Sequence, residues 1–219
     1  TRRSSDLEGC PVGVDIPEFI LALRDGDMPG AALSLKGKNS LPGICGRVCP
    51  QEVQCESRCV LGKKGAPIAI GRLERFVADW ERVTKKCPPC ELLPPSGKSA
   101  AVVGSGPAGL TCAADLARMG LKVTIFEALH EGGGVLVYGI PEFRLPNALI
   151  DDVVAKIKLL GGKFVQNFVV GKTATLQDLR AAGFWKVFVG TGAGLPRFMN
   201  VPGEHLLNVM SANEFLTRV

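Results

Sequence analysis

The chain has 219 residues, 46% of them hydrophobic and 21% charged, which is the composition of a globular protein with room for one large domain or two small ones. Its formal net charge of +5 has no basic run behind it, and no apolar stretch approaches the roughly 18 residues of a membrane span, so neither nucleic-acid binding nor membrane insertion is expected. Because no signal-peptide core follows residues 1–5, we expect a cytoplasmic, reducing environment, where the eight cysteines act as metal or redox ligands rather than as disulfides.

The N-terminal part combines short helices with closely spaced cysteines. Capping residues predict helices over about 16–24 and 29–35, and Cys45, Cys49, Cys55 and Cys59 then follow within fifteen residues. The spacing lacks the paired C-x-x-C of zinc ribbons, and this segment has no histidine. Four thiolates among glycine and Cys-Pro steps suit an iron–sulfur cluster, whose ligands arrive from several directions. Reduced thiols buried in a small helical core are the alternative.

A longer helix is expected over about 68–83, with one acidic residue on its apolar face. The face is built from Ile70, Leu73, Val77 and Trp80. Glu74 lies four residues after Ile70 and three before Val77, so its carboxylate points into that face. A buried carboxylate needs a positive partner, which predicts a cation or a metal there. A salt bridge to Arg47 or Arg58 is the alternative.

A proline-rich connector follows this helix. It contains Cys87-Pro88-Pro89-Cys90 and then Pro94-Pro95-Ser96-Gly97. We therefore predict two domains, over residues 1–96 and 97–219. Cys87 and Cys90 could be a redox dithiol, two metal ligands or exposed linker thiols, and the sequence assigns them no function.

The second domain opens with a pattern typical of dinucleotide-binding proteins. A buried strand over 100–103 leads into Gly104-Ser105-Gly106-Pro107-Ala108-Gly109, a helix over about 108–119, a strand over 123–126 and then Glu127. In such a unit the glycines let backbone approach a pyrophosphate at the helix N-terminus. The acidic residue at the end of the second strand can accept hydrogen bonds from the adenosine ribose. This context makes the glycine motif a strong one.

Two further glycine-rich segments follow. Gly132-Gly133-Gly134 allows close backbone approach to a ligand, and Arg144 lies in a loop stiffened by Pro141 and Pro146. We expect a helix over about 148–160, strands over 164–170 and 185–189, and a short helix over 176–182 between them. The last strand runs into Gly190-Thr191-Gly192-Ala193, where a dinucleotide-binding sheet would meet its ligand again.

These motifs together resemble a known family. They are Cys45-Gly46-Arg47-Val48-Cys49-Pro50, Cys55-Glu56, Cys59-Val60-Leu61-Gly62, Ile70-Gly71-Arg72-Leu73-Glu74-Arg75-Phe76, Gly104–Gly109, Gly139–Pro146 and Gly190–Ala193. From about residue 9 to 219 the chain is similar to the glutamate synthase small-subunit family. Within it, the large subunit of NADH-dependent ferredoxin:NADP oxidoreductase and the related sulfide dehydrogenase are most similar, and dihydropyrimidine dehydrogenase has a similar N-terminal region.

The resemblance implies an α-helical iron–sulfur domain followed by an α/β, Rossmann-like FAD-binding domain of the glutathione-reductase type, present here only in part. It implies a [4Fe–4S] cluster held by Cys10, Cys49, Cys55 and Glu74, with Cys59 as the rival fourth ligand and Cys45 as the next. The residues that it assigns to FAD are Gly104, Ser105, Gly106, Pro107, Ala108, Glu127, Gly134, Leu136, Arg144, Val169, Thr191 and Gly192. Electrons would pass between NAD(P)H, FAD and the cluster.

Two departures from the family pattern limit this inference. The family's second cluster takes an upstream cysteine triplet together with a residue that matches Cys59, but here Asp6 lies four residues before Cys10 and no earlier residue is cysteine. The family also continues into an NAD(P)H-binding domain, so we expect that site on a missing domain or subunit, with a redox partner subunit or ferredoxin as acceptor. A non-catalytic scaffold that carries FAD and a cluster within a larger redox complex is the alternative function.

Overall fold

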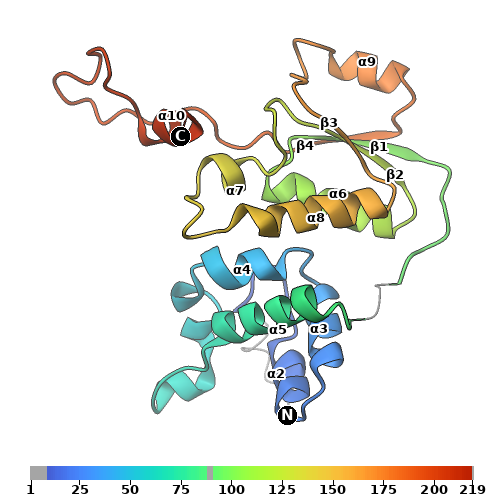
Figure 1. Cartoon of the computed structure of the whole chain (residues 1–219), viewed down its shortest axis with the longest axis vertical. Helices are drawn as coiled ribbons and strands as arrows, with labels where there is room; N and C mark the ends of the chain where they lie inside the picture. Colours follow the sequence, from blue (N-terminus) through green and yellow to red (C-terminus); the bar gives the residue numbers. More distant parts are fainter. Residues whose placement is uncertain (1–8, 88–90, 219) are drawn as a thin grey trace. The chain divides into compact units, whose positions relative to one another are not determined.

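The computed structural model describes residues 9–87 and 91–218 (Figure 1). Internal contacts divide the chain into two units, Thr1–Glu91 and Leu92–Val219, and each is described by itself. Asp6 and Cys90, both named in the sequence analysis, lie outside the described residues.

The first unit is helical. Its α-helices are α2 (Ile16–Arg24), α3 (Met28–Lys36), α4 (Pro42–Val48) and α5 (Ile70–Thr84), and three 3₁₀ turns, η1 (Gln51–Val53), η2 (Glu56–Arg58) and η3 (Val60–Lys63), lie between α4 and α5. The predicted N-terminal cap of α2 is confirmed, because the Asp15 carboxylate accepts the Glu18 N–H at 3.1 Å. Helix α5 begins two residues later than predicted and contacts both α3 and α4.

The apolar face predicted for α5 forms part of the core of this unit. Val77 is fully buried against Phe19 of α2 and Leu35 of α3, and Leu73 and Trp80 pack at the edge of the same cluster. Glu74 lies on this face and is only 9% exposed, so the expectation of a buried acid is confirmed.

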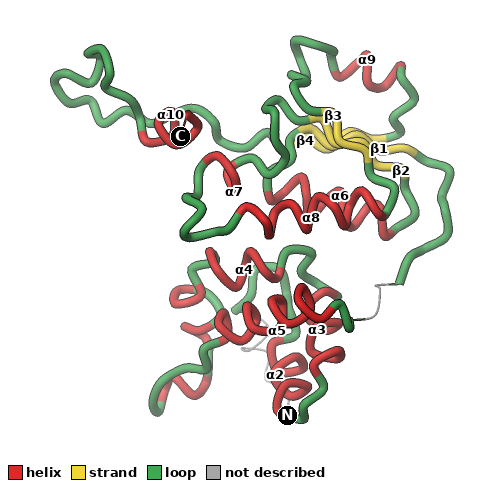
Figure 2. Tube along the Cα trace, in the orientation of Figure 1, coloured by secondary structure: helices red, strands yellow, loops and turns green. Residues whose placement is uncertain are grey.

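The second unit is built on a parallel sheet (Figure 2). Its elements are β1 (Ser99–Val103), α6 (Pro107–Arg118), β2 (Lys122–Phe126), α7 (Val135–Tyr138), α8 (Asn147–Leu159), β3 (Lys163–Val165), α9 (Leu176–Ala181), β4 (Lys186–Val189) and α10 (Ala212–Arg218). The strand order is β3-β2-β1-β4, and every pair is parallel. This order is the first part of the doubly wound nucleotide-binding sheet, so the predicted Rossmann-like fold is confirmed.

Helices cover both faces of this sheet (Figure 1). Helix α6 packs on β1 and β2 and contacts α8, and its Leu110 and Ala113 are fully buried. On the opposite face Ala101 and Val103 of β1 pack with Phe126 and with Leu179 of α9. The alternation of Ala100 to Val103 between the two covered faces explains why these four residues are all apolar.

One predicted strand is too long. The sequence suggested a strand over 164–170, but β3 ends at Val165. Asn167 has a φ of +55°, which is incompatible with an extended strand, and the Phe168 N–H then donates to the Glu127 carbonyl oxygen at 2.9 Å. The chain thus leaves the sheet edge and folds back on the end of β2.

The C-terminal part of the proline-rich connector already forms hydrogen bonds with residues of the second unit. The Leu93 N–H donates to the Arg118 carbonyl oxygen at 2.8 Å, and the Ser96 N–H donates to the Gly120 carbonyl oxygen at 2.9 Å. These hydrogen bonds explain why contacts divide the chain after Glu91, a few residues before the boundary proposed from the sequence.

Candidate cofactor sites

Three glycine turns converge at the carboxyl ends of β1 and β4. Gly104 follows β1 with a φ of +96°, and a Cβ there would lie 2.4 Å from the Gly190 carbonyl oxygen. A Cβ on Gly134 would lie 2.9 Å from the Gly106 Cα, so the second turn, at 132–134, packs on the first. Strands β1 and β4 are neighbours at the point where strand order reverses, which is where nucleotides bind in such sheets.

The backbone of the first turn leaves room for a phosphate. Gly106 is the N-cap of α6, and a Cβ at this position would meet no atom within 4 Å. A Cβ on Gly109 would lie 1.9 Å from the Gly104 carbonyl oxygen, so only glycine lets the first turn of α6 pack this closely. The free space and the N-terminal N–H groups of a 12-residue helix fit a pyrophosphate.

Glu127 ends β2 beside the first turn, and protein groups already use most of its acceptor capacity. Its Oε2 accepts hydrogen bonds from the Ser105 N–H at 2.8 Å and the Ser105 hydroxyl at 2.5 Å, and its Oε1 accepts the Leu129 N–H at 2.9 Å. A carboxylate offers about four acceptor positions, so about one remains for a ribose hydroxyl. The sequence suggested a ribose ligand and did not foresee this internal network.

Some of the other FAD-contact residues proposed from the resemblance lie near the first turn or are buried, and the rest are exposed. Gly134 and Thr191 are brought to the first turn, since a Cβ on Gly104 would lie 3.3 Å from the Thr191 Cα, and Leu136 is buried in α7. Pro107 and Ala108 form the exposed start of α6, and Gly192 is exposed after β4. Arg144 and Val169 lie in exposed loops, so their approach to a flavin stays a prediction.

In the helical unit the proposed cluster ligands are free and share one region. No disulfide joins any of the seven described cysteines, and Cys10 and Cys55 pack against the core formed by α2, α3 and α5. Among the described residues, no three histidine, cysteine, aspartate or glutamate side chains are close enough to bind one metal ion. A cuboidal cluster holds its four ligands farther apart than a single ion does, because each ligand binds a different iron atom. Thiols and a carboxylate are donor types that can bind iron, and their arrangement around a cluster stays a prediction.

Glu74 has a hydrogen-bond partner that the sequence did not reveal. The Asn39 amide donates to Glu74 Oε1 at 2.8 Å, and the Asn39 carbonyl oxygen accepts the Leu41 N–H at 2.9 Å. Arg47, one of the arginines offered as a salt-bridge partner, pairs with Asp79 at 2.7 Å. Asn39 precedes α4 in a polar turn, a pattern that predicts a loop and nothing more.

Burial disfavours the charged forms of these donors. It raises the pKa of Glu74 to about 7, against the effect of the Asn39 hydrogen bond. Burial likewise raises the pKa of Cys45 and of Cys55 to about 11. The charges of Glu74, Cys49 and Cys10 add to the shift of Cys45. The charges of Glu56 and Cys10 add to the shift of Cys55. Burial and the charges of Glu74 and Cys10 also raise the pKa of Cys49. Cluster binding would release the protons of the donors that bind it.

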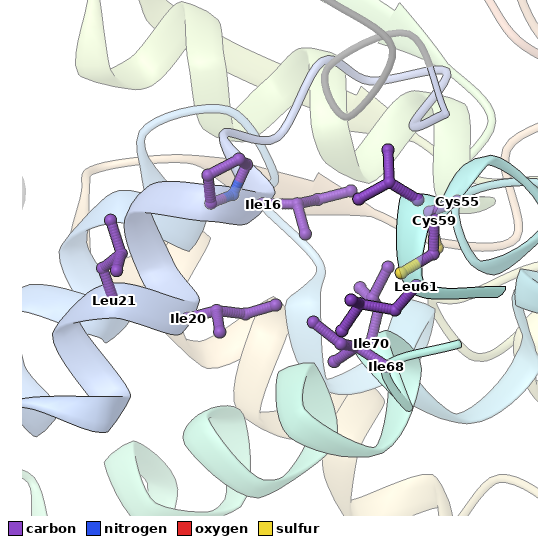
Figure 3. Close-up of a pocket in the computed structure, with 10 residues that line it drawn as sticks. Ile16, Ile20, Leu21, Cys55, Cys59, Leu61, Ile68 and Ile70 are labelled. Atoms are coloured by element: carbon purple, nitrogen blue, oxygen red, sulfur yellow. The ribbon is translucent and has the colours of Figure 1, made fainter. Parts of the chain in front are cut away.

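Cys59 lies with Cys55 on the wall of an apolar cavity of about 220 Å³ (Figure 3). The cavity is lined by Ile16, Pro17, Ile20, Leu21, Cys55, Cys59, Val60, Leu61, Ile68 and Ile70. In the close-up the two cysteines lie across the cavity from Ile20 and Leu21 of α2. An apolar surrounding of this kind limits water access to a cluster and thereby affects its potential.

Comparisons with known proteins agree with this division. A family model described as dihydropyrimidine dehydrogenase domain II, 4Fe-4S cluster, matches residues 3–86. A second model, pyridine nucleotide-disulphide oxidoreductase, matches residues 98–218, more than half of the chain. The chain belongs to the pyridine nucleotide-disulphide oxidoreductase family. The predicted pair of cofactors, a [4Fe–4S] cluster and FAD, agrees with these two matches.

Relatives of this chain match it over both regions. It is 39% identical to the NAD-dependent dihydropyrimidine dehydrogenase subunit PreT of Escherichia coli O157:H7 over 96% of this chain and 50% of the relative. It is 36% identical to the glutamate synthase [NADPH] small chain of Azospirillum brasilense over 95% of this chain and 43% of the relative. The predicted resemblance to glutamate synthase small subunits and dihydropyrimidine dehydrogenase is thus confirmed.

A solved 2-naphthoyl-CoA reductase in complex with 2-naphthoyl-CoA matches 90% of this chain and 30% of its own at a TM-score of 0.51 and 23% identity, a likeness of fold. The chain spans about half the length of the curated relatives it matches. In the described ranges, the chain has no helix both long and apolar enough to cross a membrane.

Proposed function

We propose that this chain is the FAD- and iron–sulfur-binding electron-transfer part of an NAD(P)H-linked oxidoreductase. The observation that carries the proposal is the convergence of three glycine turns at the strand-order reversal of a parallel sheet, in a chain that also holds a cysteine-rich helical unit. The turns would bind FAD, with the pyrophosphate at Gly106 and the α6 N-terminus. The flavin would exchange electrons with the cluster, which is the chemistry these groups supply when bound.

Within the helical unit we propose Cys10, Cys49, Cys55 and Glu74 as the cluster ligands. Support comes from the burial of Glu74 and from its electrostatic coupling with Cys45 and Cys49. Three thiolates and one harder carboxylate oxygen would give the cluster a different potential from four thiolates. Glu74→Ala should lose iron or change the paramagnetic signal, and Glu74→Cys should keep a cluster with a shifted potential. Full iron, an unchanged potential and an unchanged signal in Glu74→Ala would remove Glu74 from the set.

The nicotinamide site and the electron acceptor belong to partners in this proposal. The relatives PreT and the glutamate synthase small chain are named as parts of larger assemblies, which supports a partner subunit here, and ferredoxin is the other candidate acceptor. A cytoplasmic location is part of the proposal, because the ligand set requires reduced thiols.

The test is a spectrum of the protein purified without oxygen, followed by cofactor release. FAD in the released fraction, together with iron and acid-labile sulfide, is the expected result. Recovery of nicotinamide nucleotide alone from well-loaded protein would contradict the FAD assignment. Bleaching of the flavin bands by a physiological donor, in the presence of the partner, would separate an electron-transfer part from a non-catalytic scaffold.

A further inference from the structure

Ser105 is a fully buried residue at the meeting point of two glycine turns and the end of β2. It is 0% exposed. Its backbone N–H and its hydroxyl both donate to Glu127 Oε2, and its Oγ accepts the Gly133 N–H at 2.9 Å. The hydroxyl of Ser105 therefore donates one hydrogen bond and accepts another, both with protein groups.

The Glu127 side of this network ties the first turn to β2. Glu127 is 5% exposed, and a carboxylate buried to that extent is costly unless it accepts hydrogen bonds. The bonds from Ser105 and Leu129 supply that compensation, and bonds to a charged acceptor are stronger than neutral ones. The Gly104 N–H also donates to the Phe126 carbonyl oxygen at 2.8 Å, so the turn is held both at the last residue of β2 and at Glu127, which follows it.

The Gly133 side ties the second turn to the first. Gly134 has a φ of +55° and packs so closely on Gly106 that a Cβ would lie 2.9 Å from its Cα. Turns made of glycine lose much conformational freedom when they are ordered. The bond from Gly133 to the Ser105 hydroxyl is the side-chain contact that joins these two turns in register.

We propose that Ser105 is a positioning residue for FAD rather than a ligand through its side chain. Its hydroxyl holds the turns at 104–106 and 132–134, and the carboxylate of Glu127, in the binding arrangement before the cofactor arrives. The turns then lose their conformational entropy when the protein folds rather than when FAD binds, so less of the binding free energy is lost on association. This inference rests on the proposed FAD site, but its first measurement does not require FAD.

The experiment compares Ser105→Ala with wild type in cofactor-free protein by amide hydrogen exchange. The decisive amide is that of Leu129, which bonds to Glu127 and not to Ser105, and it should exchange faster in the variant. Ser96→Ala is the matched control, because the Ser96 hydroxyl also donates one hydrogen bond, to the Gly120 carbonyl oxygen, and accepts one, from the Lys98 N–H, near the opposite end of β1. Its Leu129 exchange should equal that of wild type.

FAD titration then measures the consequence. Removing one of the two hydrogen bonds to Glu127 Oε2 and leaving the Gly133 N–H without its acceptor should raise the dissociation constant of FAD about tenfold in Ser105→Ala, while the flavin potential stays unchanged. A double-mutant cycle compares Ser105→Ala and Glu127→Gln. Adding Ser105→Ala to Glu127→Gln should raise the dissociation constant of FAD by less than about twofold further, because the serine acts through the carboxylate.

Two results would overturn the proposal. Unchanged Leu129 exchange shows that Ser105 does not order the network, whatever happens to affinity. Multiplicative losses in the cycle, or a shifted potential, would make Ser105 a direct FAD contact. If wild type itself fails to bind FAD, the proposed function fails, and the Leu129 exchange still decides whether Ser105 organises the turns.

Discussion

The two units present their candidate sites in different physical states. In the sheet unit the site is made of backbone, and hydrogen bonds and glycine contacts already hold its turns together. In the helical unit the site is made of side chains, and burial raises the pKa of the thiols of Cys45, Cys49 and Cys55 and of the Glu74 carboxylate. The nucleotide site should therefore exist before its cofactor binds, whereas the cluster site is completed by its cofactor.

The largest effect should come from removing a thiol ligand. Cys49→Ser should lose most of its iron, because Cys49 is one of the three thiolates proposed to bind the cluster. Cys59→Ser should retain more iron, since Cys59 is outside the proposed ligand set. Iron and sulfide analysis after anaerobic purification measures both. Cys112→Ser in α6 is the control, and equal loss in Cys49→Ser and Cys59→Ser would make Cys59 an equal ligand.

A smaller but still large effect is expected from Gly104→Ala in the sheet unit. The φ of +96° costs an alanine about 1–2 kcal/mol, and the added Cβ would also overlap the Gly190 carbonyl oxygen. The free energy of unfolding of this unit should fall by about 3 kcal/mol, with loss of FAD binding. Gly97→Ala is the matched control, because its φ is +71° but its Cβ would meet open space, so it should lose only about 1 kcal/mol. Similar losses of unfolding free energy in both variants would mean that the close packing between the turns does not contribute to stability.

The pH dependence of the cluster-free protein should be set in part by Glu74. Its pKa rises from 4.5 to about 7 on folding, so the unfolded chain ionises first as pH increases. Stability should be greatest below about pH 4.5 for this group and should fall by about 3 kcal/mol as pH rises through about 7. Denaturant unfolding across this range measures the loss, and Glu74→Gln should flatten it. A profile that Glu74→Gln leaves unchanged would show that this carboxylate does not control it.

The smallest effect is expected from Arg144 in the loop that follows α7. The side chain is exposed, so a charge interaction with the flavin is worth at most about 1 kcal/mol. Arg144→Ala should lower the flavin potential by about 20 mV or less and weaken FAD binding by less than about fivefold. Arg180→Ala on α9 removes the same charge from the opposite face of the sheet and should change neither. An unchanged potential and affinity in Arg144→Ala would place this arginine away from the flavin.

Local patterns predicted most elements because each was specified by neighbouring residues. The cap of α2 by Asp15, the apolar face of α5 and the strand–turn–helix at Gly104 are all visible within about fifteen residues. The strand predicted over 164–170 was wrong because its end depends on the positive φ of Asn167 and on a hydrogen bond from Phe168 to Glu127. That bond joins residues too far apart for a local pattern to show.

The sequence by itself determined the division into a cysteine-rich helical part and a dinucleotide-binding part, because both signals are short and depend on residue type and spacing. Only the tertiary structure decided how the site residues are used. Ser105 meets Glu127 and Gly133, which are 22 and 28 residues away, and Glu74 meets Asn39, which is 35 residues away. The strand order and the packing of α4 on α5 bring these groups together, and no periodicity along the chain encodes which donor a buried carboxylate will find.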